Sequence, residues 1–182
     1  GTRFVLGAWD ETPFGPITDV MIERPDGHRV LIAPTTEVGT FISETYGFDE
    51  VRVETVAIQR CSTRWTVTAG TLRVEIVTAR RTALGWLLVA VPRPIARSRV
   101  WCLLINPFAR LVRPGVRTIG TTGNGREERY CALDEHRLSS ARIEWDGVDQ
   151  GALAPIDPPV RFGFGSTPRH PSLVRVTTYV AG

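Results

Sequence analysis

The sequence predicts a mainly β fold of the α+β kind: one antiparallel β-barrel or strongly curved sheet of about 11–12 strands, interrupted by two short helical insertions. Three observations lead to this prediction. Apolar and polar residues alternate with a period of two along most of the chain. Gly, Pro, Asn and Asp recur at short intervals between these runs. Helical spacing occurs in two segments only. At 182 residues, the chain is expected to form a single β-rich domain over residues 1–182.

The first elements are a hairpin and a helix. Two strands are expected over residues 17–23 and 29–34, because Pro-Asp-Gly between apolar runs favours a tight turn with Gly27 at positive φ. The first helical insertion is expected over residues 36–46. Its cap is Thr35 or Thr36 and its end is Gly47, with one apolar face made of Val38, Phe41, Ile42 and Tyr46.

Strands are expected to resume after this helix. The alternating runs at residues 50–58, 64–69 and 72–78 each predict one strand. The continuous apolar run at residues 84–91 predicts a strand that is buried on both faces.

The last third of the chain reads as further strands. Residues 116–122 and 126–133 flank Asn124-Gly125, which is a strong hairpin signal. Alternation then predicts strands over residues 141–147, 160–166 and 173–180.

The composition excludes some chemistry. All 22 basic residues are arginine, so mechanisms that need a Schiff-base lysine or a phosphate-loop lysine are excluded. The three cysteines, Cys61, Cys102 and Cys131, have no CxxC spacing and are expected to be small, buried, reduced thiols. With no signal peptide visible and no apolar run of spanning length, the expected location is cytoplasmic.

The charge is distributed unevenly. The net charge of +3 hides an acid-free block over residues 76–126 that contains nine arginines. Its centre, residues 92–117, is expected to be a basic helical insertion, with helical structure over residues 95–112, Pro94 in the first turn and a break at Pro107. An apolar stripe runs along it through Val100, Trp101, Leu104, Ile105, Phe108, Leu111 and Val112.

This basic insertion has several interpretations. The simplest is a lid packed on the barrel, with solvated arginines at its rim. A lid could also close a pocket for an apolar small molecule with an anionic head. Alternatively, the helix meets an anionic membrane surface, although one such helix supports only modest, reversible binding, or it forms a homo-oligomer interface. The pocket would be formed by Arg97, Arg99, Trp101, Phe108, Phe162 and Phe164. Nucleic acid is not favoured, because the block is poor in residues that contact bases.

A second candidate site lies in residues 127–138. Tyr130, Asp134 and His136 could perform general acid–base chemistry, because histidine titrates near neutral pH and a carboxylate can orient it. The alternative is a solvated strand end that leads into a turn. The scattered histidines predict no metal site, and no cofactor is indicated.

The function that the sequence favours is therefore binding of an apolar small molecule with an anionic head inside a barrel. An enzyme that uses the acid–base residues is the alternative. Attachment to a membrane or to another protein is the third interpretation.

Overall fold

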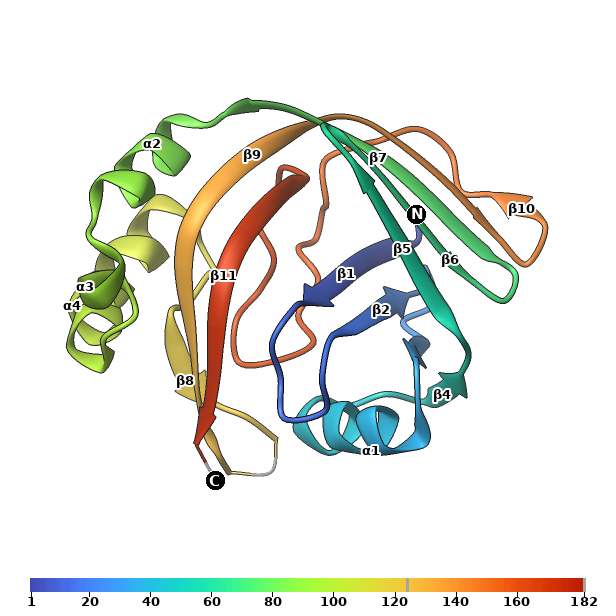
Figure 1. Ribbon diagram of the computed structural model, residues 1–182, viewed down its shortest axis with the longest axis horizontal. Coiled ribbons are helices and arrows are strands. Elements are labelled where there is room, and N and C mark those ends of the chain that lie inside the picture. Colours follow the sequence, from blue (N-terminus) through green and yellow to red (C-terminus); the bar gives the residue numbers. More distant parts are fainter. Residues whose placement is uncertain (124, 182) are drawn as a thin grey trace. The chain divides into compact units, whose positions relative to one another are not determined.

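The computed structural model describes residues 1–123 and 125–181, so Asn124 of the predicted Asn-Gly turn lies outside the described residues. The described residues form a mainly β structure of eleven strands and four helices (Figure 1). They divide into two compact units: unit 1 is residues 1–77 with 140–153, and unit 2 is residues 78–123 and 125–139 with 154–181. Strands β7 and β9 run through both units, so the prediction of a single domain stays a prediction.

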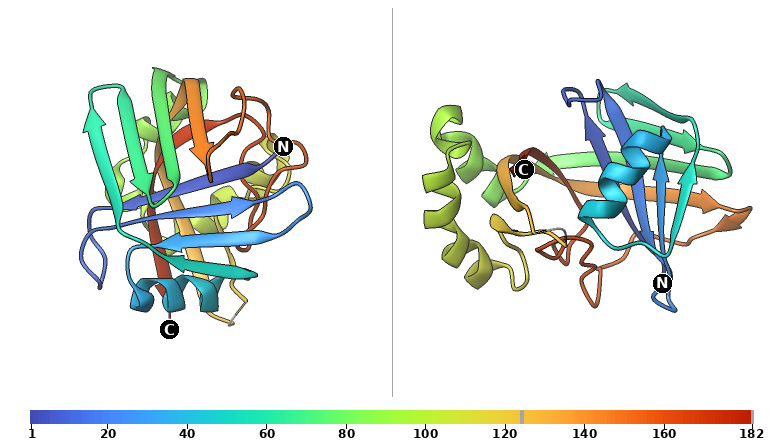
Figure 2. Two further views of the ribbon diagram at one scale, coloured as in Figure 1. Left: turned by 90° about the vertical axis from the view of Figure 1, so that its right-hand side faces the viewer. Right: turned by 90° about the horizontal axis from the view of Figure 1, so that it is seen from below.

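Unit 1 contains a four-stranded sheet in the order β1-β2-β3-β4. The predicted hairpin is confirmed, because β2 and β3 pair antiparallel with Gly27 at a φ of +88°. Strands β3 and β4 pair in parallel and are connected by helix α1 (Figure 2). The elements are β1 (Arg3–Trp9), β2 (Ile17–Glu23), β3 (Arg29–Ala33), α1 (Thr36–Thr45) and β4 (Glu50–Val53).

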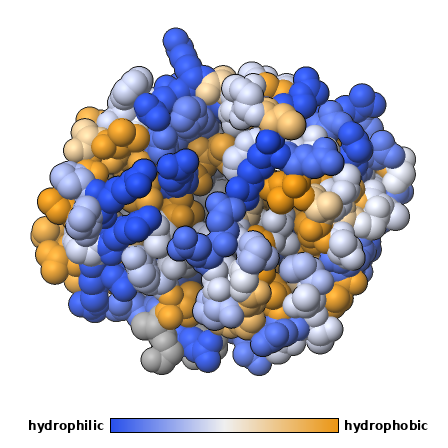
Figure 3. Space-filling view, in the orientation of Figure 1, coloured by the Kyte–Doolittle hydropathy of each residue, from blue (hydrophilic) through white to orange (hydrophobic). Residues whose placement is uncertain are grey.

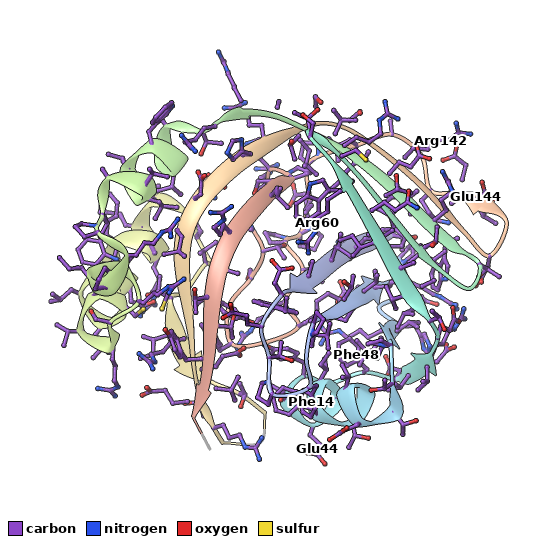
Figure 4. The ribbon with its side chains drawn as sticks, in the orientation of Figure 1. Phe14, Glu44, Phe48, Arg60, Arg142 and Glu144 are labelled. Carbon is purple, nitrogen blue, oxygen red and sulfur yellow. The ribbon has the colours of Figure 1, made fainter. Side chains whose placement is uncertain are left out.

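Helix α1 confirms the first predicted helical insertion. The Thr35 hydroxyl caps it by accepting a hydrogen bond from the backbone N–H of Val38. Its buried face, with Val38 and Ile42, packs on Leu31 of β3. Aromatic side chains complete this small core, among them Phe14 and Phe48, which Figure 4 labels beside the helix.

The second sheet has the order β10-β9-β7-β6-β5, with β8 and β11 also paired to β9. Among the described residues neither sheet closes on itself, so a barrel is not confirmed, whereas a curved sheet fits. Within unit 2, β9 and β11 bend together, and their register shifts between Arg175 and Val176. The strands are β5 (Val56–Cys61), β6 (Arg64–Ala69), β7 (Leu72–Arg81), β8 (Ile119–Thr121), β9 (Glu127–Trp145), β10 (Val148–Asp149) and β11 (Ser172–Ala181).

In unit 1 the chain passes from one sheet to the other near Glu54. The strand expected over residues 50–58 is therefore two strands, β4 in the first sheet and β5 in the second. Phe4 and Trp145 lie between the sheets with their rings edge to face, 6.1 Å apart. This contact links β1 of the first sheet to β9 of the second.

The prediction for residues 84–91 is wrong, because they lie in helix α2 (Ala83–Ala90) and not in a buried strand. Thr82 caps the helix by accepting a hydrogen bond from the Gly85 N–H. Five of the eight residues of α2 are Leu or Ala, and both are strong helix formers. Only Gly85 of this helix is buried.

Two further strand predictions are corrected. Residues 160–166 form no strand; their glycines leave an irregular loop, closed by a hydrogen bond from the Thr167 N–H to the Val160 carbonyl. The turn expected near Asp134 is absent, because β9 continues through it for 19 residues. The pairing of β9 with β11 keeps this stretch extended.

The basic insertion contains helices α3 (Arg93–Ala96) and α4 (Arg99–Val112). The expected break at Pro107 is wrong, since α4 passes through that residue. The chain breaks instead before Arg99, where the Ser98 hydroxyl caps α4 by accepting from the Trp101 N–H.

Candidate functional site

The helices α2, α3 and α4, with their capping residues, form what we call the helical segment (residues 82–113). One buried carboxylate of β9 holds both of its ends. Thr82, the N-cap of α2, donates to Glu135 Oε2 at 2.6 Å. Arg113, the C-cap of α4, donates to Oε1 and Oε2 at 2.5 and 2.9 Å. The segment is thus fastened to the strand at its two ends.

The environment keeps Glu135 ionised. Burial raises the pKa of this carboxyl, but the hydrogen bonds from Arg113 and Thr82 outweigh burial and leave the pKa below its ordinary value. Gly85 of α2 packs against the backbone of the same residue, where a Cβ atom would collide with the Glu135 carbonyl oxygen. The start of α2 therefore lies directly on β9.

Helix α4 packs on its neighbours through one narrow face. The Thr118 hydroxyl donates to the Cys102 carbonyl at 2.7 Å, and the Thr118 N–H donates to Asn106 Oδ1 at 3.0 Å. Cys102 is the buried residue of this helix and contacts Cys131 of β9.

The opposite face of α4 is apolar and exposed. At about 100° per residue, the stripe residues named below lie roughly 160–240° around the helix from Cys102. The stripe residues Val100, Leu104, Phe108 and Leu111 are 65%, 71%, 52% and 81% exposed. Figure 3 shows hydrophobic groups alternating with hydrophilic groups over these helices, at the left edge of the view. Apolar side chains exposed together in this way are typical of contact surfaces.

Helix α2 adds to this surface. Trp86 and Leu87 are 63% and 64% exposed. Sequence reasoning missed both, because it treated their apolar run as a buried strand. The signal that could have found them is the Thr82 cap in front of a run rich in Ala and Leu.

Arginines surround the apolar stripe. Three arginines of the acid-free block form ion pairs with carboxylates: Arg81, Arg99 and Arg113. Within residues 82–117, four others are exposed and have no carboxylate partner among the described residues: Arg93, Arg97, Arg110 and Arg117. These four guanidinium groups are available to an anionic partner.

The structure places the predicted ligand-binding residues in two groups. Arg97, Arg99, Trp101 and Phe108 belong to the helical segment, where Arg99 forms a two-bond pair with Glu127 at 2.8 and 3.0 Å. Phe162 and Phe164 lie in the loop of residues 151–171, where Phe164 is buried. Its ring packs on Tyr130, with the ring centroids 4.7 Å apart, and covers Gly120.

Two of the three predicted acid–base residues meet. His136 Nε2 lies 3.4 Å from Asp134 Oδ2, and His136 Nδ1 is 3.1 Å from the Ala79 carbonyl oxygen. Arg81 occupies both carboxylate oxygens of Asp134, at 2.8 and 3.0 Å. Burial raises the pKa of Asp134, but hydrogen bonds from Arg81 and from a backbone N–H outweigh burial. The pKa of Asp134 is therefore below its ordinary value. Tyr130, four residues along the strand and so about 13 Å away, packs on Phe164 instead.

Unit 1 contains a shallow, open groove of about 400 Å³. Trp9, Ile17 and Arg60 are among its lining residues, and Figure 4 labels Arg60. Arg60 donates to Asp10 at 2.9 Å and stacks on the ring of Trp65. The guanidinium group of Arg60 therefore already has partners within unit 1.

Asp19 of β2 is an unusual buried carboxyl. It is fully buried, and neither oxygen has a hydrogen-bond partner among the described residues. Burial raises the pKa of Asp19 to about 6; the nearby indole N–H of Trp9, outside hydrogen-bonding geometry, offsets this effect in part. Gly7 on β1 leaves the space that this side chain fills.

Neither a metal site, nor a membrane-spanning helix, nor a related protein is found for the described residues. Within residues 1–123 and 125–181, no three His, Cys, Asp or Glu side chains are grouped so that they could hold a metal ion. No helix in the same residues has the length and apolar character needed to cross a membrane. Comparisons with protein-family models, curated proteins and solved structures returned no match to this chain.

Proposed function

We propose that the helical segment attaches this protein to the surface of an anionic membrane. The observation that carries the proposal is the apolar stripe of α4, which faces away from β9 and is exposed along its length. It lies within an acid-free block of nine arginines. A helix with this combination binds in the plane of a bilayer, with its apolar face among the acyl chains and its arginines at the phosphates.

The positive charge of the helical segment favours an anionic bilayer over a second copy of this chain as its partner. A second copy docked through the same face would bring its own Arg93, Arg97 and Arg110 against those of the first copy, so that like charges would face one another. An anionic bilayer supplies the opposite charge and an apolar interior together. Each arginine near such a surface contributes about 1 kcal/mol.

A free apolar molecule with an anionic head has the chemistry of a single lipid and remains the second proposal. The half-buried Trp101 and the exposed Phe108 and Arg97 would hold it. An open helical surface suits a bilayer better, because a small-molecule site encloses most of its ligand. A catalytic role for Asp134 and His136 is less well supported, because Arg81 occupies the carboxylate.

Co-sedimentation with phosphatidylcholine vesicles, with and without phosphatidylglycerol, tests the proposal. The protein is expected to bind the anionic vesicles and to be released as the salt concentration rises. Salt weakens the attraction because it shortens the Debye length, which is about 10 Å at 0.1 M. Leu104→Gln and Leu111→Gln should each lower the partition coefficient about tenfold, for roughly 1.5 kcal/mol of lost apolar burial. Arg93→Gln with Arg110→Gln should lower it about 30-fold.

The matched control is Val148→Gln on β10, an apolar residue that is 59% exposed outside the helical segment. It should leave vesicle binding unchanged. Binding of monomeric fatty acid without vesicle binding would favour the small-molecule proposal. Concentration-dependent dimerisation that the Leu104 substitution abolishes would point to a homo-oligomer interface instead.

A further inference from the structure

Two cysteine thiols meet where α4 packs on β9. Cys102 Sγ and Cys131 Sγ lie 3.2 Å apart, and the two residues are 1% and 2% exposed. Both thiols are reduced, and 29 positions separate them in the sequence. Their contact is therefore made by packing of the helix on the strand. Cys61, the third cysteine, is exposed on β5 of unit 1.

The backbone is held on both sides of this contact. Thr118 donates to the Cys102 carbonyl at 2.7 Å, and Cys131 lies opposite Thr177 of β11. A disulfide has a sulfur–sulfur distance of about 2.05 Å, so the two sulfurs need to approach by only about 1.1 Å. Small rotations of the two side chains are expected to bring them together.

We infer that Cys102 and Cys131 are a modification site, and that a low-molecular-weight disulfide oxidant converts them into an intramolecular disulfide linking α4 to β9. One cysteine thiolate attacks the oxidant and releases its first thiol, leaving a mixed disulfide. The thiolate of the other cysteine then displaces the second thiol. The protein loses two electrons and two protons, and the oxidant disulfide is reduced to two thiols.

Burial controls the rate of this reaction. Burial, together with the neighbouring Cys102, raises the pKa of the Cys131 thiol to about 12, so this thiol is protonated at neutral pH. Exchange therefore starts when α4 separates briefly from β9, and the disulfide closes when the helix returns. The linkage does not depend on the proposed membrane function. Since Cys102 lies opposite the exposed stripe, the linkage leaves that stripe facing outward.

The test uses Cys61→Ser protein, which removes the exposed thiol and with it intermolecular disulfides. The reduced protein is incubated with oxidised glutathione, at neutral pH and in urea below the unfolding transition, so that α4 opens. It is then denatured, alkylated and weighed by mass spectrometry. The expected product has lost two hydrogens, carries no alkyl group, and yields one peptide pair joined through Cys102 and Cys131. Reduction should reverse it, and its Tm should be higher by about 5–10 °C.

The matched control is Cys131→Ser in the same background. Its Cys102 should remain open to alkylation or carry one glutathione, with no internal link. The inference is overturned if the Cys61→Ser protein keeps two alkylatable thiols after this treatment. It is equally overturned if the two cysteines end with separate glutathione adducts, because either result shows that the sulfurs do not join.

Discussion

At the scale of the residue, two buried carboxyls behave in opposite ways. Asp19 has no hydrogen-bond partner among the described residues, so burial favours its neutral form. Glu135 accepts hydrogen bonds from Arg113 and Thr82, so its charged form is favoured despite burial. The opposite directions of the two pKa shifts follow from their partners, because Arg113 and Thr82 offset the burial of Glu135 and no comparable pair offsets the burial of Asp19.

Asp19→Asn should stabilise the protein at alkaline pH. The pKa of Asp19 is about 6 in the folded protein against 3.8 for an ordinary aspartate. Asp19 contributes its full stabilisation below pH 3.8, and this contribution is lost as the pH rises through about 6. The gain on removing the charge is about 3 kcal/mol at pH 8 and about 0.5 kcal/mol at pH 4. Urea unfolding at the two pH values measures it, with the exposed Asp10→Asn as control. An equal effect of Asp19→Asn at both pH values would contradict the raised pKa.

Glu135→Gln should destabilise the protein by about 3 kcal/mol, because it leaves the Arg113 charge without its buried partner. The lowered pKa of Glu135 means that its contribution is present at neutral pH and is lost as pH falls below the ordinary range of glutamate. Glu127→Gln is the matched control, since Glu127 pairs with the exposed Arg99 and should matter far less. Equal losses of unfolding free energy in urea would show that Glu135 does not fasten the helical segment.

At the scale of the element, the attachment of α2 depends on the close approach of Gly85 to β9. Gly85→Ala should destabilise the protein, although alanine favours a helix interior by about 1 kcal/mol. Gly47→Ala, where a Cβ meets no atom within 4 Å, should be neutral or slightly stabilising. Urea unfolding compares the two variants. A stabilising effect of Gly85→Ala would show that α2 does not lie against the strand.

The elements also show what the sequence could and could not predict. Helix α1 and the β2–β3 hairpin depend on local signals, the Thr35 cap and Gly27, and both predictions are confirmed. Residues 84–91 have no periodicity, so helix and strand could not be told apart by pattern. The continuity of β9 through Asp134 depends on pairing with β11, a long-range contact that no local signal encodes.

The candidate site was predicted only in part. The acid-free block and the stripe from Val100 to Leu111 are visible in the sequence as composition and spacing. The side on which α4 packs is not visible there, because Cys102 and Asn106 contact β9 and Thr118 through tertiary structure. The stripe was therefore expected to cover a barrel, whereas it faces outward.

At the scale of the whole molecule, the positive charge of the chain is concentrated in the stretch that carries the exposed apolar side chains of α2 and α4. The net charge is only +3, but residues 76–126 contribute nine positive charges and no negative charge. A bilayer surface responds to local charge, because screening limits the interaction to about 10 Å at 0.1 M salt. We therefore expect the helical segment, and not the chain as a whole, to make the contact.

A polarity-sensitive fluorophore on one cysteine reports whether the helical segment enters the bilayer. In Cys61→Ser protein with Leu104→Cys, the label sits on the exposed stripe; in unmodified protein it sits on the exposed Cys61. Phosphatidylglycerol vesicles should shift the emission at position 104 to the blue and brighten it, because the stripe enters the acyl region, while the label at Cys61 should not change. No change at position 104, or an equal change at both positions, would contradict attachment through the helical segment.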